Sequence, residues 1–216
     1  MTWPEQAERA KERYEGGQGR DLDQRQLTQL GNAAWAAGLC LLMDGRSDES
    51  RDWLRTAARR YRESWDAGTP PDSWGRPIAA MKALLVAGDD AKDAAQWALD
   101  AGARDAASPI GTYAACLALL CLGEDVEARA LGSTLRDRDD FPPPVADAIV
   151  TVAATDRAGY LLAIEDILES FEQREEFLED VRVADTVLVF QQLARERDCD
   201  VELRPSPLLP DRAAQS

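Results

Sequence analysis

The feature that most constrains this chain is a phrase that recurs three times: an Ala- and Leu-rich helical segment, a glycine, and the acidic start of a second helical segment. The phrases are LLMDGRSDESRDWL, LLVAGDDAKDAAQWAL and LLCLGEDVEARAL, and their glycines, Gly45, Gly88 and Gly123, lie 43 and 35 residues apart. Recurrence at this spacing is typical of stacked repeats, in which each unit buries its apolar face against its neighbours. A fourth, poorer unit is expected from Pro143 through AATDRAGYLLAI.

Apolar residues recur with a helical period along almost the whole chain, and clusters of Gly, Pro or Asp separate the segments. Strand-like alternation occurs only in the short Val201-Glu202-Leu203. The predicted fold class is therefore all-α. The expected helices cover about residues 3–15, 23–43, 47–66, 74–87, 90–102, 107–122, 124–137, 143–154, 156–178 and 183–197.

We predict a single domain over residues 1–204, followed by a proline-rich tail over 205–216. A helix at 183–197 is expected to cap the array. Residues 183–190 are apolar nearly all round, which places that helix at the centre of the packing. The repeat-like units cover about residues 24–66, 74–102, 107–137 and 143–178.

The three phrases resemble the tetratricopeptide repeat, whose units are helix pairs with a G-x-x-x-E-A phrase at the turn between them. Gly38 falls where that family has its helix-packing glycine, and Ala128 fits its small second-helix position. The resemblance covers about residues 24–180 and implies a right-handed array of stacked antiparallel helical hairpins. The departures are Met81 and Cys116 at the glycine position, and Ser50 and Asp93 at the small position.

The resemblance also implies a binding surface. In tetratricopeptide arrays the first helix of each pair lines a concave groove, and an apolar groove with a few polar groups suits a short peptide. The residues that this register places on the groove include Asn32, Trp35, Lys82 and Tyr113. The alternative is that the two rings, Trp35 and Tyr113, belong to the core.

The helix expected at 47–66 carries an arginine stripe made of Arg51, Arg55, Arg59 and Arg62, which lie within about 80° of one another. Asp48, Asp52 and Glu63 are placed to pair with some of them at i,i+3 or i,i+4. Two interpretations stay open. The stripe is either a solvated, internally paired face, or a site whose guanidinium groups grip an anion or an acidic peptide.

A second charged face is acidic. Residues 139–180 hold 12 acidic side chains and only two arginines. The glutamate stripe, Glu165, Glu169, Glu172, Glu176 and Glu179, lies within about 80° on the helix expected at 156–178. This face is either solvated or a docking surface for a basic partner. A third hypothesis joins both stripes across protomers, in a homo-oligomer that forms a ring or a filament.

The overall charge is −15, from 24 Asp and 16 Glu against 22 Arg and only three Lys. So acidic a chain is not expected to bind nucleic acid, because phosphate contacts need clustered basic residues. An excess of Asp combined with Arg in place of Lys is typical of a salt-in halophile. An ordinary acidic actinobacterial protein is the alternative.

The chain has no histidine, which excludes Ser-His-Asp, Cys-His and histidine–zinc chemistry. The cysteines, Cys40, Cys116, Cys121 and Cys199, lack a metal or redox spacing and are expected to be small buried residues. We therefore expect no catalytic residue, no metal and no cofactor. A carboxylate-only hydrolase stays open, although nothing singles out one pair of acids.

The N-terminal sequence has no apolar stretch typical of a signal peptide, and the longest apolar run, residues 33–43, is too short to span a bilayer. We expect a cytoplasmic protein without membrane contact.

The function that these features favour is protein–protein interaction, as an adaptor or regulatory binder of another protein or a peptide. The C-terminal sequence VADTVLVFQQLARERDCDVELRPSPLLP resembles the ends of certain helical-repeat bacterial immunity proteins, which makes a toxin-neutralising protein one alternative. An enzyme of unfamiliar carboxylate-based type and a purely structural homo-oligomer are the others.

Overall fold

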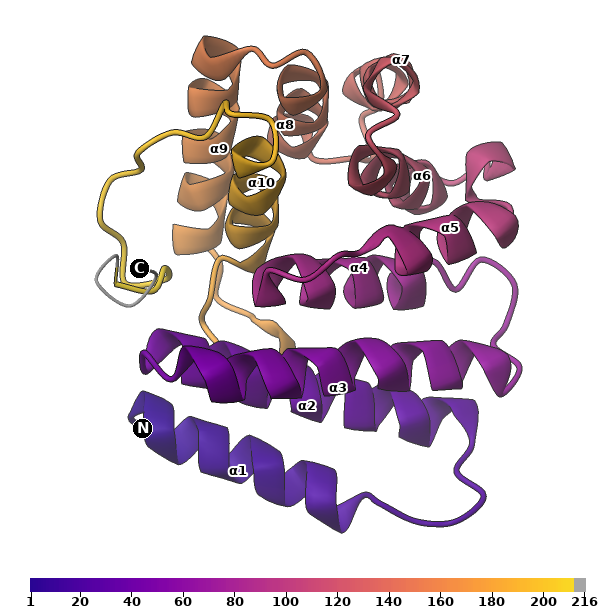
Figure 1. Ribbon diagram of the computed structural model, residues 1–216, viewed down its shortest axis with the longest axis vertical. Helices are drawn as coiled ribbons and strands as arrows, with labels where there is room; N and C mark the ends of the chain where they lie inside the picture. The colour runs from indigo at the N-terminus through magenta and orange to yellow at the C-terminus, as the bar shows by residue number, and fades with distance from the viewer. Residues whose placement is uncertain (212–216) are drawn as a thin grey trace.

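The computed structural model describes residues 1–211, which form ten α-helices joined by short turns and loops (Figure 1). Two single-turn 3-10 helices, Ala103–Asp105 and Leu178–Asp180, lie in the longer connections. The α-helices are α1 (Trp3–Gly16), α2 (Gln24–Met43), α3 (Ser47–Asp66), α4 (Gly75–Ala87), α5 (Lys92–Asp100), α6 (Pro109–Leu122), α7 (Asp125–Arg136), α8 (Pro143–Ala153), α9 (Arg157–Glu172) and α10 (Asp185–Arg195).

These elements confirm the all-α class and every helix expected from the sequence. Each boundary lies within two residues of the expected one except the end of α9, which is Glu172 rather than about 178. Within residues 1–211 there is no strand, and Val201–Leu203 is irregular. In the same part of the chain, every helix is too short or too polar to cross a bilayer.

The same type of turn joins the two helices of each of the four hairpins. In each case a backbone N–H donates a 2.9 Å hydrogen bond to a carbonyl five residues earlier, and the residue before it has a positive φ, as in the Schellman motif. The positive-φ residues are Gly45, Gly88, Gly123 and Thr155, with φ values of 78°, 73°, 76° and 53°. The fourth unit is thus a helix pair as expected, with Thr155 where the other units have glycine.

The hairpin of α2 and α3 depends on a close approach at Gly38. A Cβ atom built on Gly38 would lie 2.7 Å from Cγ of Leu54, so only glycine lets the two helices pack this closely. Ser50, which differs from the tetratricopeptide pattern, is 1% exposed, and its hydroxyl donates a 2.7 Å hydrogen bond to the carbonyl oxygen of Gly38. A buried hydroxyl with a partner costs little, which explains why serine is accepted here.

The helix pairs stack in chain order, and their first helices form an inner layer in which α6 contacts both α4 and α8. Figure 1 shows α1–α3 lying across the molecule and α8 and α9 standing at a steep angle to them, with α10 in the bend. Contacts of α10 reach α4 as well as α8 and α9. The last helix therefore turns back onto the inner layer instead of extending the stack.

After α10 the chain runs without regular structure past α9 towards the turn between α2 and α3 (Figure 1). We call residues 200–211 the strap. Leu203 and Leu208 are 7% and 4% exposed, and Pro210 is buried as well. Residues 205–211, expected as a separate tail, are thus part of the packed structure, and the rest of the expected tail, 212–216, lies outside the described residues.

Candidate functional site

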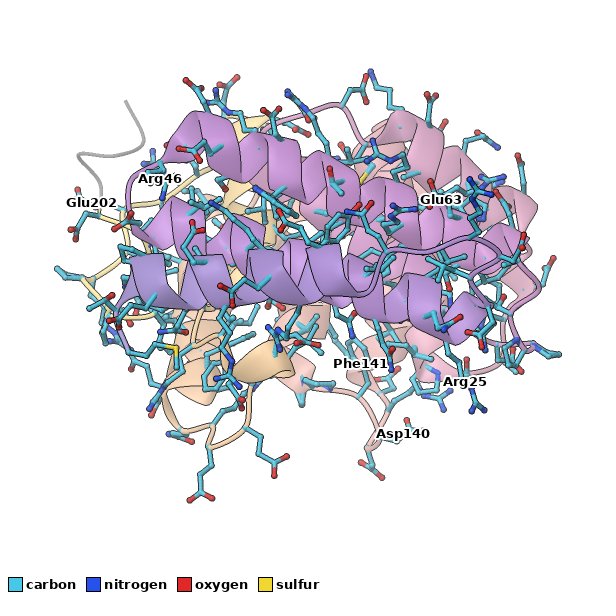
Figure 2. The ribbon with its side chains drawn as sticks, turned by 90° about the horizontal axis from the view of Figure 1, so that it is seen from below. Arg25, Arg46, Glu63, Asp140, Phe141 and Glu202 are labelled. Carbon is cyan, nitrogen blue, oxygen red and sulfur yellow. The ribbon has the colours of Figure 1, made fainter. Side chains whose placement is uncertain are left out.

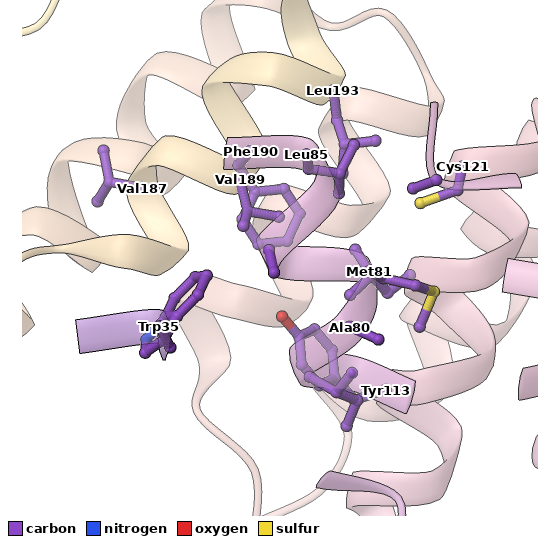
Figure 3. Packing of buried hydrophobic residues seen from close by; sticks show 14 of the residues in the cluster. Trp35, Ala80, Met81, Leu85, Tyr113, Cys121, Val187, Val189, Phe190 and Leu193 are labelled. Atoms are coloured by element: carbon purple, nitrogen blue, oxygen red, sulfur yellow. The ribbon is translucent and has the colours of Figure 1, made fainter. Parts of the chain in front are cut away.

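Two of the residues expected to line a peptide groove are core residues. Trp35 on α2 is 5% exposed and Tyr113 on α6 is 7% exposed, and both belong to the main hydrophobic cluster. Figure 3 shows both rings in the interior, where Val189 and Phe190 of α10 also lie. The expectation that these rings face an open groove is therefore wrong, and the alternative, that they are core, is confirmed.

The two polar residues of the expected groove have partners within the protein. Oδ1 of Asn32 accepts a 2.9 Å hydrogen bond from the hydroxyl of Tyr61 on α3. The Lys82 ammonium lies 2.7 Å from a carboxylate oxygen of Asp185 and donates a 3.2 Å hydrogen bond to the hydroxyl of Thr186, both in the first turn of α10. Neither side chain is left free for a peptide.

The groove is filled because α10 has a strongly apolar side. Val187, Val189, Phe190 and Leu193 are all 0% exposed. Burying each such side chain stabilises the fold by roughly 1.5–3 kcal/mol, so the inner layer is a favourable place for the helix. The central role predicted for residues 183–190 is confirmed. The register of the repeats alone does not show what covers their inner face.

The arginine stripe is an exposed and internally paired face on α3. Arg51 pairs with Asp48, Arg55 with Asp52 and Asp89, Arg59 with Glu63, and Arg62 with Asp66. Arg55 makes the strongest of these contacts, donating hydrogen bonds of 2.7 and 2.8 Å to Asp89 after α4. Those bonds lower the pKa of Asp89 and tie two hairpins together. The pairs with Asp48, Asp52 and Glu63 are the expected ones.

The glutamate stripe is shorter than expected because α9 ends at Glu172. Glu165 and Glu172 both accept hydrogen bonds from Arg204 of the strap, and Glu169 accepts one from Gln173. Glu176 lies beyond the helix in an exposed turn, and Glu179 pairs with Arg13 on α1. The C-terminal end of a helix carries a partial negative charge, so further glutamates there are unfavourable. This explains why α9 ends at Glu172 and not near residue 178.

Both charged faces thus find partners in the same chain. The glutamates of α9 do dock a basic group, but it is the protein's own Arg204. The hydrogen bonds from Arg204 and Ser206 lower the pKa of Glu172. A homo-oligomer joined through the two stripes stays a prediction, and sedimentation at increasing salt concentration tests it.

A large hollow lies beside the strap. It has a volume of about 1410 Å³ and opens to solvent between the strap, the outer side of α10, the end of α4 and the turn between α2 and α3. Figure 2 shows that Arg46 of that turn and Glu202 of the strap lie at the same end of the molecule, away from Arg25 and Glu63. We call this hollow the strap cavity.

The strap cavity has both apolar and charged walls. Its half-buried apolar side chains include Val86, Leu188, Val201 and Leu209. Its polar side chains include Arg51, Arg157, Gln191, Gln192, Arg195 and Asp200. Among the described residues, Arg157 and Arg195 have no carboxylate within ion-pair distance, whereas most other arginines near the cavity are paired. Arg195 donates a 3.2 Å hydrogen bond to the side-chain oxygen of Gln192, which leaves its other N–H groups, and those of Arg157, to acceptors of a bound molecule.

The cysteines are poor nucleophiles. All four are buried and free, and burial raises the pKa of Cys40, Cys116 and Cys121 to about 12 each. A thiol with such a pKa is protonated at neutral pH and unreactive. Their expected role as small buried residues is confirmed. Within residues 1–211 no His, Cys, Asp and Glu side chains form a group that could hold a metal ion.

The sequence did not point to the strap cavity. Its walls come from α3, α4, α9, α10 and the strap, and only the path of α10 and the chain after it brings them together. One signal was present in the C-terminal sequence, where Leu208 and Leu209 lie between Pro207 and Pro210. Apolar residues in an otherwise solvated tail indicate that it packs against something.

No family model matches the chain, and neither does any curated protein or solved structure.

Proposed function

We propose that this chain is a protein–protein interaction module, an adaptor or regulatory binder, that holds a segment of its partner in the strap cavity. The observation that carries the proposal is the cavity itself, about 1410 Å³ and open to solvent. Small-molecule sites measure about 300–1,000 Å³, so a hollow of this size has room for several residues of a peptide.

The walls suit a peptide chain in two ways. Half-buried Val86, Leu188 and Leu209 offer contacts to apolar side chains. Arg157 and Arg195 offer donors to main-chain carbonyls or carboxylates. A mixture of apolar anchors and a few placed polar groups is what peptide-recognition surfaces use.

The proposal includes the setting in which the protein works. We infer a cytoplasmic protein of a salt-in halophile, on the basis of its charge of −15 and its use of Arg in place of Lys. A partner from such a cell meets the protein at high salt, where long-range attraction between charges is screened. Contacts inside a partly enclosed cavity keep their strength better than exposed ion pairs do.

Site-specific photocrosslinking tests the proposal. A photoreactive residue replaces Leu188 in the cavity wall of the full chain, and the protein is irradiated in native extract at high salt. The matched control places it at Val126 on α7, which is 89% exposed and outside the cavity. We expect a discrete adduct from position 188 that an excess of untagged protein abolishes. Equal labelling at the two positions, or none at 188, would contradict the proposal.

A further inference from the structure

The strap is held on α9 through one arginine. The guanidinium of Arg204 donates hydrogen bonds of 3.0 Å to Glu165 and of 2.9 and 2.7 Å to the two carboxylate oxygens of Glu172. Glu165 and Glu172 are seven residues apart, two turns along one side of α9, so their carboxylates enclose the guanidinium from two sides. The hydroxyl of Ser206 donates a further 2.8 Å hydrogen bond to Glu172.

Apolar anchors and main-chain hydrogen bonds complete the contact. Leu203 and Leu208, on either side of Arg204, are buried. The carbonyl of Leu208 accepts a 2.9 Å hydrogen bond from the backbone N–H of Ala184, and the carbonyl of Val201 accepts one of 3.2 Å from Gln191. One charged fork, two apolar anchors and a few main-chain bonds are how an extended peptide binds a protein surface.

Several features make the strap easier to displace than a core segment. It has no regular structure, and its other side borders the open strap cavity. The Arg204 side chain is 44% exposed, and ion pairs at such exposure contribute little each. Its tether to the rest of the chain gives the strap a high effective concentration at its site.

We propose that the surface of α9 and α10 under the strap is a docking site for an extended segment of a partner protein. This segment carries an arginine followed by proline and leucine residues. The strap occupies the site until the partner segment displaces it. The acidic surroundings favour an arginine, because residues 139–180 hold 12 acidic side chains and two arginines. This inference rests on the proposed function and names the chemistry of the partner segment.

The test uses the full chain with Arg204→Glu, which repels its own strap from Glu165 and Glu172. The probe is a fluorescent peptide with the strap sequence DVELRPSPLLPD, followed by anisotropy in about 0.5 M potassium chloride so that weak long-range attraction is screened. We expect the variant to bind the peptide at least about tenfold more tightly than the unaltered chain, because the tethered competitor is removed. A peptide with glutamate in place of the arginine should bind the same variant at least about tenfold more weakly.

Two further variants separate recognition from unfolding. A Glu172→Arg chain should prefer the glutamate peptide to the arginine peptide. The matched control is Glu169→Arg on the same helix, whose carboxylate accepts a hydrogen bond from Gln173, and it should weaken binding of the arginine peptide far less than Glu172→Arg does. If Arg204→Glu proves unfolded by circular dichroism, Glu172→Gln takes its place, because it weakens the strap without adding repulsion. The same arginine peptide should then compete with the strap for its site, and faster hydrogen exchange at residues 200–211 in the presence of the peptide measures strap release.

Three results would overturn the inference. The first is a folded Arg204→Glu chain that fails to bind the peptide at millimolar concentration. The second is hydrogen exchange at residues 200–211 that is as slow as in the core cluster of the unaltered chain. The third is a dimer of the unaltered chain that exchanges straps between copies. If one of these results occurs and position 188 still gives a discrete crosslink, the proposed function stands. Only the inference that the strap occupies the partner's site is then contradicted.

Discussion

The ammonium of Lys82 on α4 lies 2.7 Å from a carboxylate oxygen of Asp185, in the first turn of α10. The two side chains are 15% and 19% exposed, so the pair is mostly shielded from water. An acidic residue in the first turn also interacts favourably with the helix dipole. This pair joins α4, in the inner layer of the array, to α10, the helix that covers that layer. The helix pairs α6–α7 and α8–α9 lie between them in the sequence.

The first prediction concerns this pair. Lys82→Met leaves the carboxylate of Asp185 partly buried without its partner, so we expect the free energy of unfolding to fall by about 1–3 kcal/mol. Adding Asp185→Asn removes the uncompensated charge and should recover part of the loss. Urea denaturation of the two single variants and the double variant measures the coupling. Additive effects would show that the two groups do not interact.

The second prediction concerns the rings that the repeat register places on a groove. Because Trp35 and Tyr113 are core residues, each change to alanine should lower the free energy of unfolding by about 3–5 kcal/mol. The control is Ile110→Ala on α6, a residue that is 44% exposed, which should change stability by about 0.5 kcal/mol or less. Ring variants as stable as the control would restore the open groove.

Local signals explain why so much of the fold could be predicted. The turn glycines, the prolines and the helical period act within a few residues, and they placed all ten helices. The end of α9 was missed because the period of the glutamates continues past Glu172, while the repulsion among them and the helix dipole oppose a longer helix. A periodic pattern carries no information on that balance.

The inner face of the array was harder to predict for a different reason. The register of a repeat indicates which residues face inward, but not whether a groove there is open. Trp35 and Tyr113 became core residues because α10 folds back over them. The path of the strap is harder still to predict. Arg204 and Leu208 anchor it, but they lie in a segment without a helical period of apolar residues, and their partners are more than 20 residues away in the sequence.

The third prediction concerns the turn of the fourth hairpin. Thr155 has a φ of 53°, in the left-handed region where a β-branched residue is strained. Thr155→Gly removes that strain and should raise the free energy of unfolding by about 0.5–1.5 kcal/mol, after the extra entropy of glycine in the unfolded chain is subtracted. The matched control is Gly88→Ala in the equivalent turn, which should destabilise by about 1 kcal/mol or more. Thermal denaturation compares them, and a less stable Thr155→Gly chain would contradict the strain argument.

The fourth prediction concerns salt. Residues 67–216 carry 28 acidic and 14 basic side chains, whereas residues 1–66 carry 12 and 11, so the self-repulsion is concentrated after α3. The Debye length is ~10 Å at 0.1 M salt and ~3 Å at 1 M, so molar salt removes most of the repulsion between neighbouring carboxylates. The folded state holds these charges closer together than the unfolded chain does, and screening should stabilise it. We therefore expect the midpoint of thermal unfolding in potassium chloride to rise steeply between about 0.1 and 2 M.

The same reasoning predicts where the fold opens first. Residues 139–180 carry the densest negative charge, and their compensation from outside the segment comes from exposed contacts with Arg13, Arg136, Arg138 and Arg204. The arginine stripe of α3, by contrast, lies in a segment whose acids and bases nearly balance. At low salt we expect residues 139–180 to exchange amide hydrogens before residues 24–66, and molar potassium chloride to reduce the difference. Chloride is the suitable anion, because sulfate also strengthens apolar burial. Two results would contradict the halophile proposal: a midpoint of thermal unfolding that does not change with salt, or amide exchange that starts in α2 and α3. Either would also show that the uneven distribution of charge has little effect on stability.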